Sequence, residues 1–129
     1  MITVFAVHLF DVFIAEINKA RLEDPKKELN SFIKDFVKDF IYKHQDITRF
    51  FGNLRLIYEQ LKSGSTGPRP FSNDYIQRMA SIANAQHSPK DLAIIYYYCY
   101  YDSEFKELID PYNVFKHMDK RSLLPELQT

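Results

Sequence analysis

The chain has 129 residues, which is enough for one domain with its own core and too few for two. Lysine plus arginine equals aspartate plus glutamate at 17 each, which argues against a dedicated duplex-DNA binder, because phosphate neutralisation supplies much of that affinity. The single cysteine, Cys99, excludes an intrachain disulfide and a multi-cysteine zinc site. We therefore expect a protein of a reducing, cytoplasmic compartment without cofactors or metals.

The residue content favours helices. Aromatic residues make up 16% of the chain, from eleven Phe and nine Tyr without Trp, and there are three glycines. Few glycines mean few tight turns, which disfavours a hairpin-rich β fold. The sequence predicts an all-α fold, a compact bundle of five or six helices that forms one domain over residues 1–129.

The first segment, residues 2–22, is apolar at its beginning. Asp11 and Glu16 interrupt it well short of the roughly 20 residues that span a bilayer, and no basic region precedes it. It therefore predicts a buried helix rather than a signal peptide or a membrane anchor. The β-branched residues in 2–4 leave a short N-terminal strand as the alternative.

Two amphipathic helices come next. Residues 25–44 carry apolar residues at spacings of three and four, with Pro25 suited to the first helical position. A third helix, from Asp46 or Thr48 to Lys62, is weakened by about 1 kcal/mol at Gly52. Residues 63–71 hold the two other glycines and predict an internal loop that serves as a linker.

The second half begins with two capped helices. Ser72 is suited to cap a helix that runs to Gln86, and Ser88-Pro89-Lys90-Asp91 is a strong start signal for a fifth helix that ends near Tyr101. Asp110-Pro111 predicts a further short helix to Met118, and residues 122–129 are expected to fray. The fourth helix is expected to turn five side chains inward: Tyr75, Ile76, Met79, Ile82 and Ala83.

No catalytic motif is recognisable. Cys99 falls near a predicted helix C-terminus, where the helix dipole disfavours a thiolate, so it is interpreted as a buried structural residue. There is no glycine-rich phosphate loop, and the acidic pairs lack the spacing of a calcium loop. The four histidines are far apart in sequence, and none has a second His or a Cys at a ligand spacing: His8, His44, His87 and His117. We expect no enzymatic activity.

A tyrosine run, residues 96–101 with Cys99 inside it, is the main candidate for a functional surface. Six successive helical positions point in every direction, so they cannot all enter one core stripe. Three interpretations stay open: core with partly exposed rings, a protein interface that includes homodimerisation, and base stacking on single-stranded nucleic acid. The predicted partner-binding residues are Tyr96, Tyr97, Tyr100, Tyr101 and Phe105.

From Phe51 onward the chain resembles the C-terminal domain of phage replication proteins of the helicase-recruiting, initiator type. The matching residues are short motifs, and the Trp that the family usually carries is absent. The resemblance implies a phage or mobile-element protein that binds a replicative helicase or its loader. It is carried by Ser88, Asp91, Leu92, Asp102, Ile109, Pro111, Val114 and Phe115.

These observations predict a non-enzymatic protein–protein interaction module that recruits or inhibits a host replication component, through the aromatic surface of the fifth helix. A homodimeric accessory protein is one alternative. The other is a nucleic-acid-binding regulator, which the neutral net charge disfavours. Its basic face would consist of Arg49, Arg55, Lys62, Arg69 and Arg78.

Overall fold

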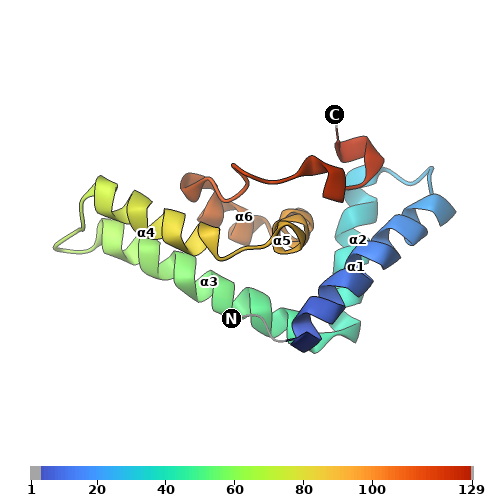
Figure 1. Ribbon diagram of the computed structural model, residues 1–129, viewed down its shortest axis with the longest axis horizontal. Helices are drawn as coiled ribbons and strands as arrows, with labels where there is room; N and C mark the ends of the chain where they lie inside the picture. Colours follow the sequence, from blue (N-terminus) through green and yellow to red (C-terminus); the bar gives the residue numbers. More distant parts are fainter. Residues whose placement is uncertain (1–3, 129) are drawn as a thin grey trace.

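The computed structural model describes residues 4–128 as an all-α protein, which confirms the predicted fold class (Figure 1). Within these residues there is no strand. Of the predicted short strand, residues 2 and 3 lie outside the described residues and Val4 is already helical. Six α-helices are present: α1 (Val4–Glu23), α2 (Leu29–Lys43), α3 (Gln45–Thr66), α4 (Asn73–Ala85), α5 (Pro89–Tyr101) and α6 (Ser103–Ile109). Three short 3₁₀ helices follow: η1 (Asp110–Tyr112), η2 (Lys120–Ser122) and η3 (Pro125–Leu127).

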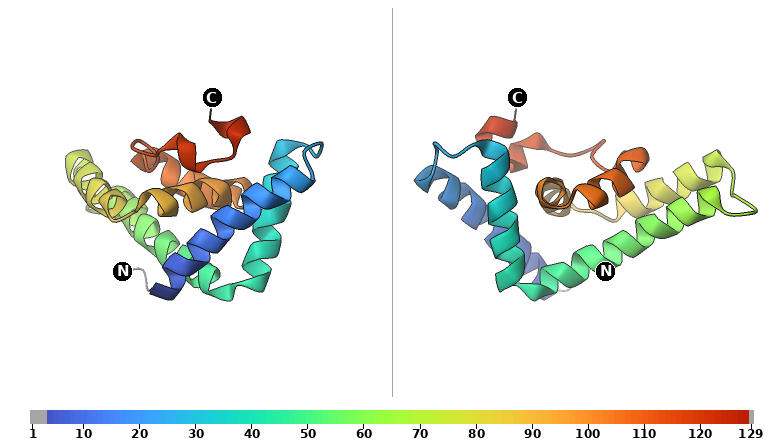
Figure 2. Two further views of the ribbon diagram at one scale, coloured as in Figure 1. Left: turned by 45° about the vertical axis from the view of Figure 1, so that its right-hand side comes forward. Right: turned by 180° about the vertical axis from the view of Figure 1, so that it is seen from behind.

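The helices form an elongated bundle around α5. Helices α1 and α2 lie at one end, the α3–α4 hairpin extends to the other, and α5 lies between them (Figures 1 and 2). Four successive residues of α5, from Leu92 to Ile95, are buried. A helix that is apolar around most of its circumference is stable only when neighbours cover all of its faces, and α1, α2, α6 and η2 all pack against α5.

Helix α2 begins four residues later than predicted. The Glu28 carboxylate accepts hydrogen bonds from the backbone N–H groups of Asn30 (3.0 Å) and Ser31 (2.8 Å), and these bonds hold the pKa of Glu28 below its usual value. Glu28 therefore caps the helix, and Pro25 lies in the turn before it. The predicted apolar stripe does enter the core, through Phe32, Ile33, Val37 and Phe40.

Helix α6 was not predicted. Asp102 caps it, because one carboxylate oxygen accepts from the backbone N–H of Phe105 at 3.0 Å. The other oxygen accepts from Arg55 (2.5 Å) and from the Tyr98 hydroxyl (3.1 Å), which ties α6 to α3 and α5. The short helix expected after Asp110-Pro111 is a single 3₁₀ turn, which ends at Asn113 in the left-handed conformation, with φ 53°.

The prediction that residues 122–129 fray is wrong for the described part of the segment. Leu123 and Leu124 are buried in the main core, and the backbone N–H of Leu124 donates to the Tyr97 hydroxyl at 2.7 Å. Glu126 accepts from the Arg21 guanidinium at 2.6 Å, which links the C-terminal segment to α1. Two leucines that fill a space beside α5 hold the segment in place.

The loop predicted over 63–71 is shorter than expected, because α3 continues through Thr66. The hydroxyls of Ser65 and Thr66 donate to the carbonyl of Lys62, at 2.7 and 3.0 Å, within the last turn. Beyond the loop, the backbone N–H of Phe71 donates to the carbonyl of Gly64 at 2.8 Å. This bond folds the chain back, so that Phe71 lies against α3.

The two glycines of α3 provide a matched test of this geometry. A Cβ added at Gly52 would meet no atom within 4 Å, whereas a Cβ at Gly64 would lie 3.0 Å from the Phe71 ring. We expect Gly52→Ala to raise the free energy of unfolding by about 1 kcal/mol, since alanine is the better helix former. Gly64→Ala should raise the free energy of unfolding by less, because the Phe71 ring must shift to make room for the added methyl group. Urea denaturation measures both, and equal gains would contradict the contact between Gly64 and Phe71.

Candidate functional site

Helix α5 begins as its sequence predicts. The Ser88 hydroxyl accepts from the backbone N–H of Asp91 (3.2 Å), and the Asp91 carboxylate accepts from the backbone N–H of Ser88 (3.0 Å). Together they form a capping box, with Pro89 in the first turn. Asp91 is buried, so water does not compete for these two hydrogen bonds.

The predicted partner surface on α5 is largely core. Tyr97 and Phe105, which were predicted to contact a partner, are fully buried, so this structure offers neither side chain to a partner. The Tyr97 ring packs against Phe13 of α1, and burial raises the pKa of its hydroxyl to about 12. Phe105 packs edge-on against Tyr98 at 5.1 Å between ring centroids. Neighbouring helices enclose α5 on most sides, so its tyrosine rings pack against side chains of the same protein.

The other three predicted residues are only partly accessible. Tyr96 and Tyr100 are half-buried and pack edge-on against each other at 5.7 Å, and Tyr96 also contacts Phe115. Tyr101 is the most accessible of the five, with 36% of its surface exposed. Cys99 is buried as expected, and this burial raises the pKa of its thiol to about 12. The tyrosine helix therefore offers a single exposed ring rather than a contact surface.

The five predicted basic residues do not form one face. Arg55 is paired with Asp102, and it shares a groove with Lys62 and three glutamates, Glu59, Glu104 and Glu107. Arg49 lies at the other end of α3, beside Asp46 and Tyr42. The remaining two are Arg69, in the α3–α4 connection, and Arg78, on the exposed side of α4. Acidic neighbours thus offset the charge of Arg49, Arg55 and Lys62, which weakens the basic face predicted for a nucleic-acid-binding surface.

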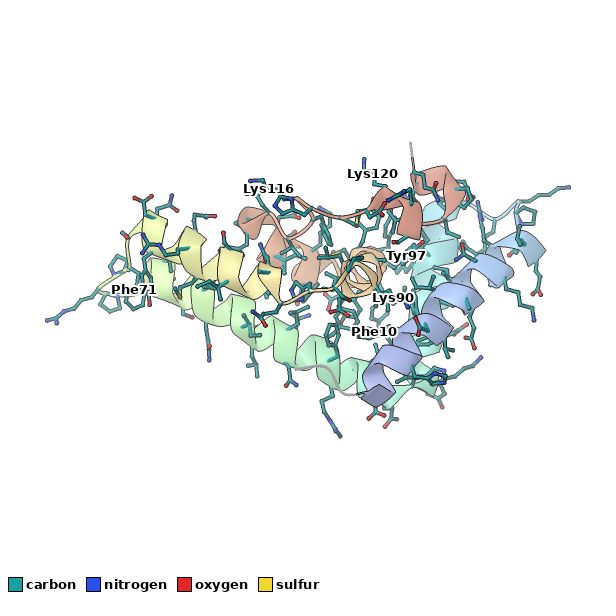
Figure 3. All side chains as sticks on the ribbon, viewed as in Figure 1. Phe10, Phe71, Lys90, Tyr97, Lys116 and Lys120 are labelled. Carbon is teal, nitrogen blue, oxygen red and sulfur yellow. The ribbon has the colours of Figure 1, made fainter. Side chains whose placement is uncertain are left out.

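A different surface, on the α3–α4 hairpin, is strongly apolar. Five of the eight large hydrophobic residues that are exposed in the described chain belong to these two helices or to the loop that joins them. Phe71 and Tyr75 pack together at 4.8 Å between ring centroids. Phe71 marks the outer end of the hairpin, away from the body of the molecule (Figure 3). The five residues are Leu56, Ile57, Phe71, Tyr75 and Ile82, and we call them the hairpin face.

A groove of about 330 Å³ runs along the hairpin face. None of the described residues that line it carries a charged side chain. Successive turns of the two helices form its walls, since Ile57, Leu61 and Gly64 of α3 oppose Tyr75, Met79 and Ala83 of α4. By contrast, the groove on the other side of the same hairpin is lined by Arg55, Glu59 and Lys62. The hairpin thus has one charged side and one apolar side.

Part of the hairpin face was expected to lie in the core. Tyr75 and Ile82 were expected to point inward, but 41% and 53% of their surfaces are exposed. Helix α4 carries two apolar stripes: Ile76 and Ala80 are buried, whereas Tyr75, Met79 and Ile82 follow a second stripe at spacings of four and three. The second stripe was the signal that could have indicated an exposed face.

The histidines are closer in space than in sequence. His87 and His117 line one groove, of about 500 Å³, between the end of α4, the beginning of α5 and the segment after η1. Thirty positions separate them in sequence, so no motif spacing could have indicated that they share a groove.

Within the part of the chain that the structure describes, no group of three His, Cys, Asp or Glu side chains could hold a metal ion. Likewise, none of the described helices is both long and apolar enough to cross a membrane.

Comparison with known proteins corrects the resemblance drawn from the sequence. Neither the curated proteins nor the solved structures contain a match to the chain. A family model described as "Putative phage abortive infection protein" matches residues 42–123. The matched family is therefore not that of the replication initiators or helicase-recruiting domains, and the earlier resemblance is wrong. The residues behind the earlier resemblance are caps, such as Ser88 and Asp102, and core side chains, such as Leu92 and Val114, which serve any helical bundle.

The match extends from the end of α2 through Leu123, and so covers both the hairpin face and the groove of the two histidines. It spans more than half of the chain. The chain therefore belongs to the family that this model describes, "Putative phage abortive infection protein".

Proposed function

We propose that this protein takes part in defence against phage by binding another protein, not by catalysis, and that the hairpin face is its contact surface. The uncharged groove among the exposed hydrophobic residues of α3 and α4 is the observation that supports this proposal. Large contiguous apolar surfaces are uncommon on soluble monomers and mark interaction sites. The family match, which includes the whole hairpin, supports the defence role.

The shape and charge of the groove define the kind of partner. Its walls are two neighbouring helices with side chains in successive turns, which suits the ridge of a third helix. Because no charged residue lines the groove, the side of the partner that enters it must be apolar. We therefore propose an amphipathic helix of another protein, with apolar residues at spacings of three and four, as the occupant. A replication helicase or loader is not proposed, because that expectation rested on the corrected resemblance.

The proposal is tested by phage infection of cells that express the protein. The Ile57→Ser/Tyr75→Ser variant removes apolar surface from both walls of the groove. Leu22→Ser/Tyr42→Ser is the matched control, since Leu22 and Tyr42 are 82% and 84% exposed and lie outside the groove. Compared with cells that lack the protein, we expect fewer plaques on cells that express the wild type or the control variant. With the hairpin variant we expect as many plaques as on cells that lack the protein. Equal protection by both variants would refute the hairpin face as the contact surface.

Light scattering distinguishes the partner from a second copy of the chain. We expect the wild-type protein to be a monomer, since the proposed occupant is another protein. A dimer that the hairpin variant converts to a monomer would refute that occupant and identify the homodimer as the assembly. Circular dichroism of both variants measures whether loss of protection reflects loss of fold. Both changes lie at exposed positions, so we expect native helicity in each.

A further inference from the structure

The groove that contains His87 and His117 has a lining unlike that of the other grooves. It lies on a different side of α4 from the hairpin face, so it is a second site, separate from the proposed partner surface. Its volume, about 500 Å³, is in the range of sites that take small ligands. Among the described residues no carboxylate lines it, whereas amide, hydroxyl, imidazole and ammonium groups do: those of Gln77, Ser81, Asn84, Asn113, Lys116 and both histidines.

The positive charge of this groove comes from the segment after η1. Asn113 in its left-handed conformation turns the chain there, and Lys116 and His117 follow at the rim. Both side chains are exposed, and Lys116 takes part in none of the ion pairs that the described residues form. Figure 3 shows Lys116 near α6 and Lys120 farther along the same segment, towards α2. A free ammonium group beside a groove without carboxylates favours an anion.

A chain of hydrogen bonds determines which nitrogen of His87 carries the proton. The backbone carbonyl of Tyr112 only accepts, so the Asn84 amide presents its NH₂ group to it, at 2.7 Å. The Asn84 oxygen therefore faces Tyr58 and accepts from its hydroxyl at 2.6 Å. The hydroxyl proton is thereby committed, and the His87 Nε2, 3.3 Å from the Tyr58 oxygen, must donate to it. Neutral His87 then has a lone pair on Nδ1.

The surroundings of His87 keep it neutral. Burial lowers the pKa of its imidazole, and the buried Asp91 carboxylate nearby opposes this only in part. Tyr58 is fully buried and holds the ring from one side. His87 lines the groove and, as a neutral imidazole, has an acceptor at Nδ1, while Lys116 and His117 have donors.

The third component of the groove is apolar. Pro89, Leu92 and Val114 line it together with Tyr112. A ligand that matches all three components has an anionic group for Lys116, an aromatic ring whose face packs on this wall, and an N–H or O–H donor for His87. We propose that the groove binds a nucleoside phosphate, with the phosphate at Lys116 and His117 and the nucleoside towards His87.

Calorimetric titration of the full chain with adenosine and guanosine monophosphate tests the proposal, with the free nucleosides and inorganic phosphate as further arms. We expect at least one nucleotide to bind about tenfold more tightly than its nucleoside or phosphate, because contact with both ends of the groove is then combined. Equal binding of phosphate would refute recognition of the nucleoside. Absence of binding in every arm would refute the site.

Charge variants locate the site. Lys116→Ala should weaken nucleotide binding about tenfold, the loss expected for one charged hydrogen bond. Lys120→Ala is the matched control: Lys120 is an exposed lysine of the same segment and does not line the groove, so binding should be unchanged. Equal losses in both variants would show attraction to net charge only and overturn the proposal. Since both lysines are exposed, neither change should affect folding.

Nitrogen NMR of the imidazoles tests the acceptor without a variant. We expect the Nε2–H tautomer for His87 in the free protein at neutral pH, and a shift of its Nδ1 resonance when the nucleotide is added. An Nδ1–H tautomer, or an Nδ1 resonance that nucleotide leaves unchanged, would contradict the role of His87.

Discussion

Replacing Phe105 by alanine is expected to lower the free energy of unfolding by about 3–5 kcal/mol, the range for removal of a buried aromatic ring. Phe105 is fully buried where α6 meets α3 and α5. Its ring packs edge-on against Phe51 at 5.9 Å and Tyr98 at 5.1 Å, and the Arg55 guanidinium lies over it at 5.8 Å. Alanine would leave a cavity that these rings, held by their own contacts, can fill only partly.

Urea denaturation followed by circular dichroism measures this change. Tyr101→Ala is the control on the same aromatic region, because 36% of the Tyr101 surface is exposed and its loss should cost far less. Both residues were predicted from the sequence to contact a partner. A Phe105→Ala protein that keeps its stability would contradict the assignment of Phe105 to the core.

Alkaline unfolding is the second large effect that we expect. Burial raises the pKa values of the Tyr58, Tyr97 and Cys99 side chains to about 12, from ordinary values of 10.0 for tyrosine and 9.0 for cysteine. The unfolded chain therefore loses these protons at lower pH than the folded protein. Their contribution to stability is fully present below pH 9 and is lost as the pH rises towards 12.

Urea unfolding at a series of pH values above neutrality checks this expectation, with tyrosinate absorbance as a direct probe of ionisation. We expect the unfolding midpoint to fall steeply above pH 10, with tyrosinate of the buried rings appearing together with unfolding. Tyr42→Phe is the control, since Tyr42 is 84% exposed and should not change the slope. Constant stability up to pH 12, with tyrosinate of every ring formed in the folded state, would contradict the burial of these hydroxyls.

The sequence by itself determined the helices whose signals are local. Ser88 and Asp91 reach only backbone atoms within the same turn, so the start of α5 could be predicted from four residues. The stripe of α2 from Phe32 to Phe40 was equally evident, because its period alone defines one buried side. The all-α class follows from such local signals repeated along the chain.

The cap of α6 depended on tertiary structure. Asp102 does have a local role at the N–H of Phe105, but its carboxylate is also oriented by Arg55, which lies 47 positions earlier. The C-terminal leucines, 123 and 124, had no local signal for order. They are ordered because α5 and its Tyr97 hydroxyl lie beneath them. In both places a partner distant in sequence decides the local structure.

The functional surfaces were the least predictable from the sequence. The tyrosine run predicted an interface, but α5 lies at the centre of the bundle and its rings meet neighbouring helices. The apolar residues of α4 predicted a core, yet Tyr75 and Ile82 of its second stripe stay exposed because α3 can cover only one side of a helix. Hydrophobic spacing thus showed which residues of one helix lie in the same stripe, such as Ile76 with Ala80. Which faces are covered depends on how the helices are placed around one another, and only the tertiary structure decides that.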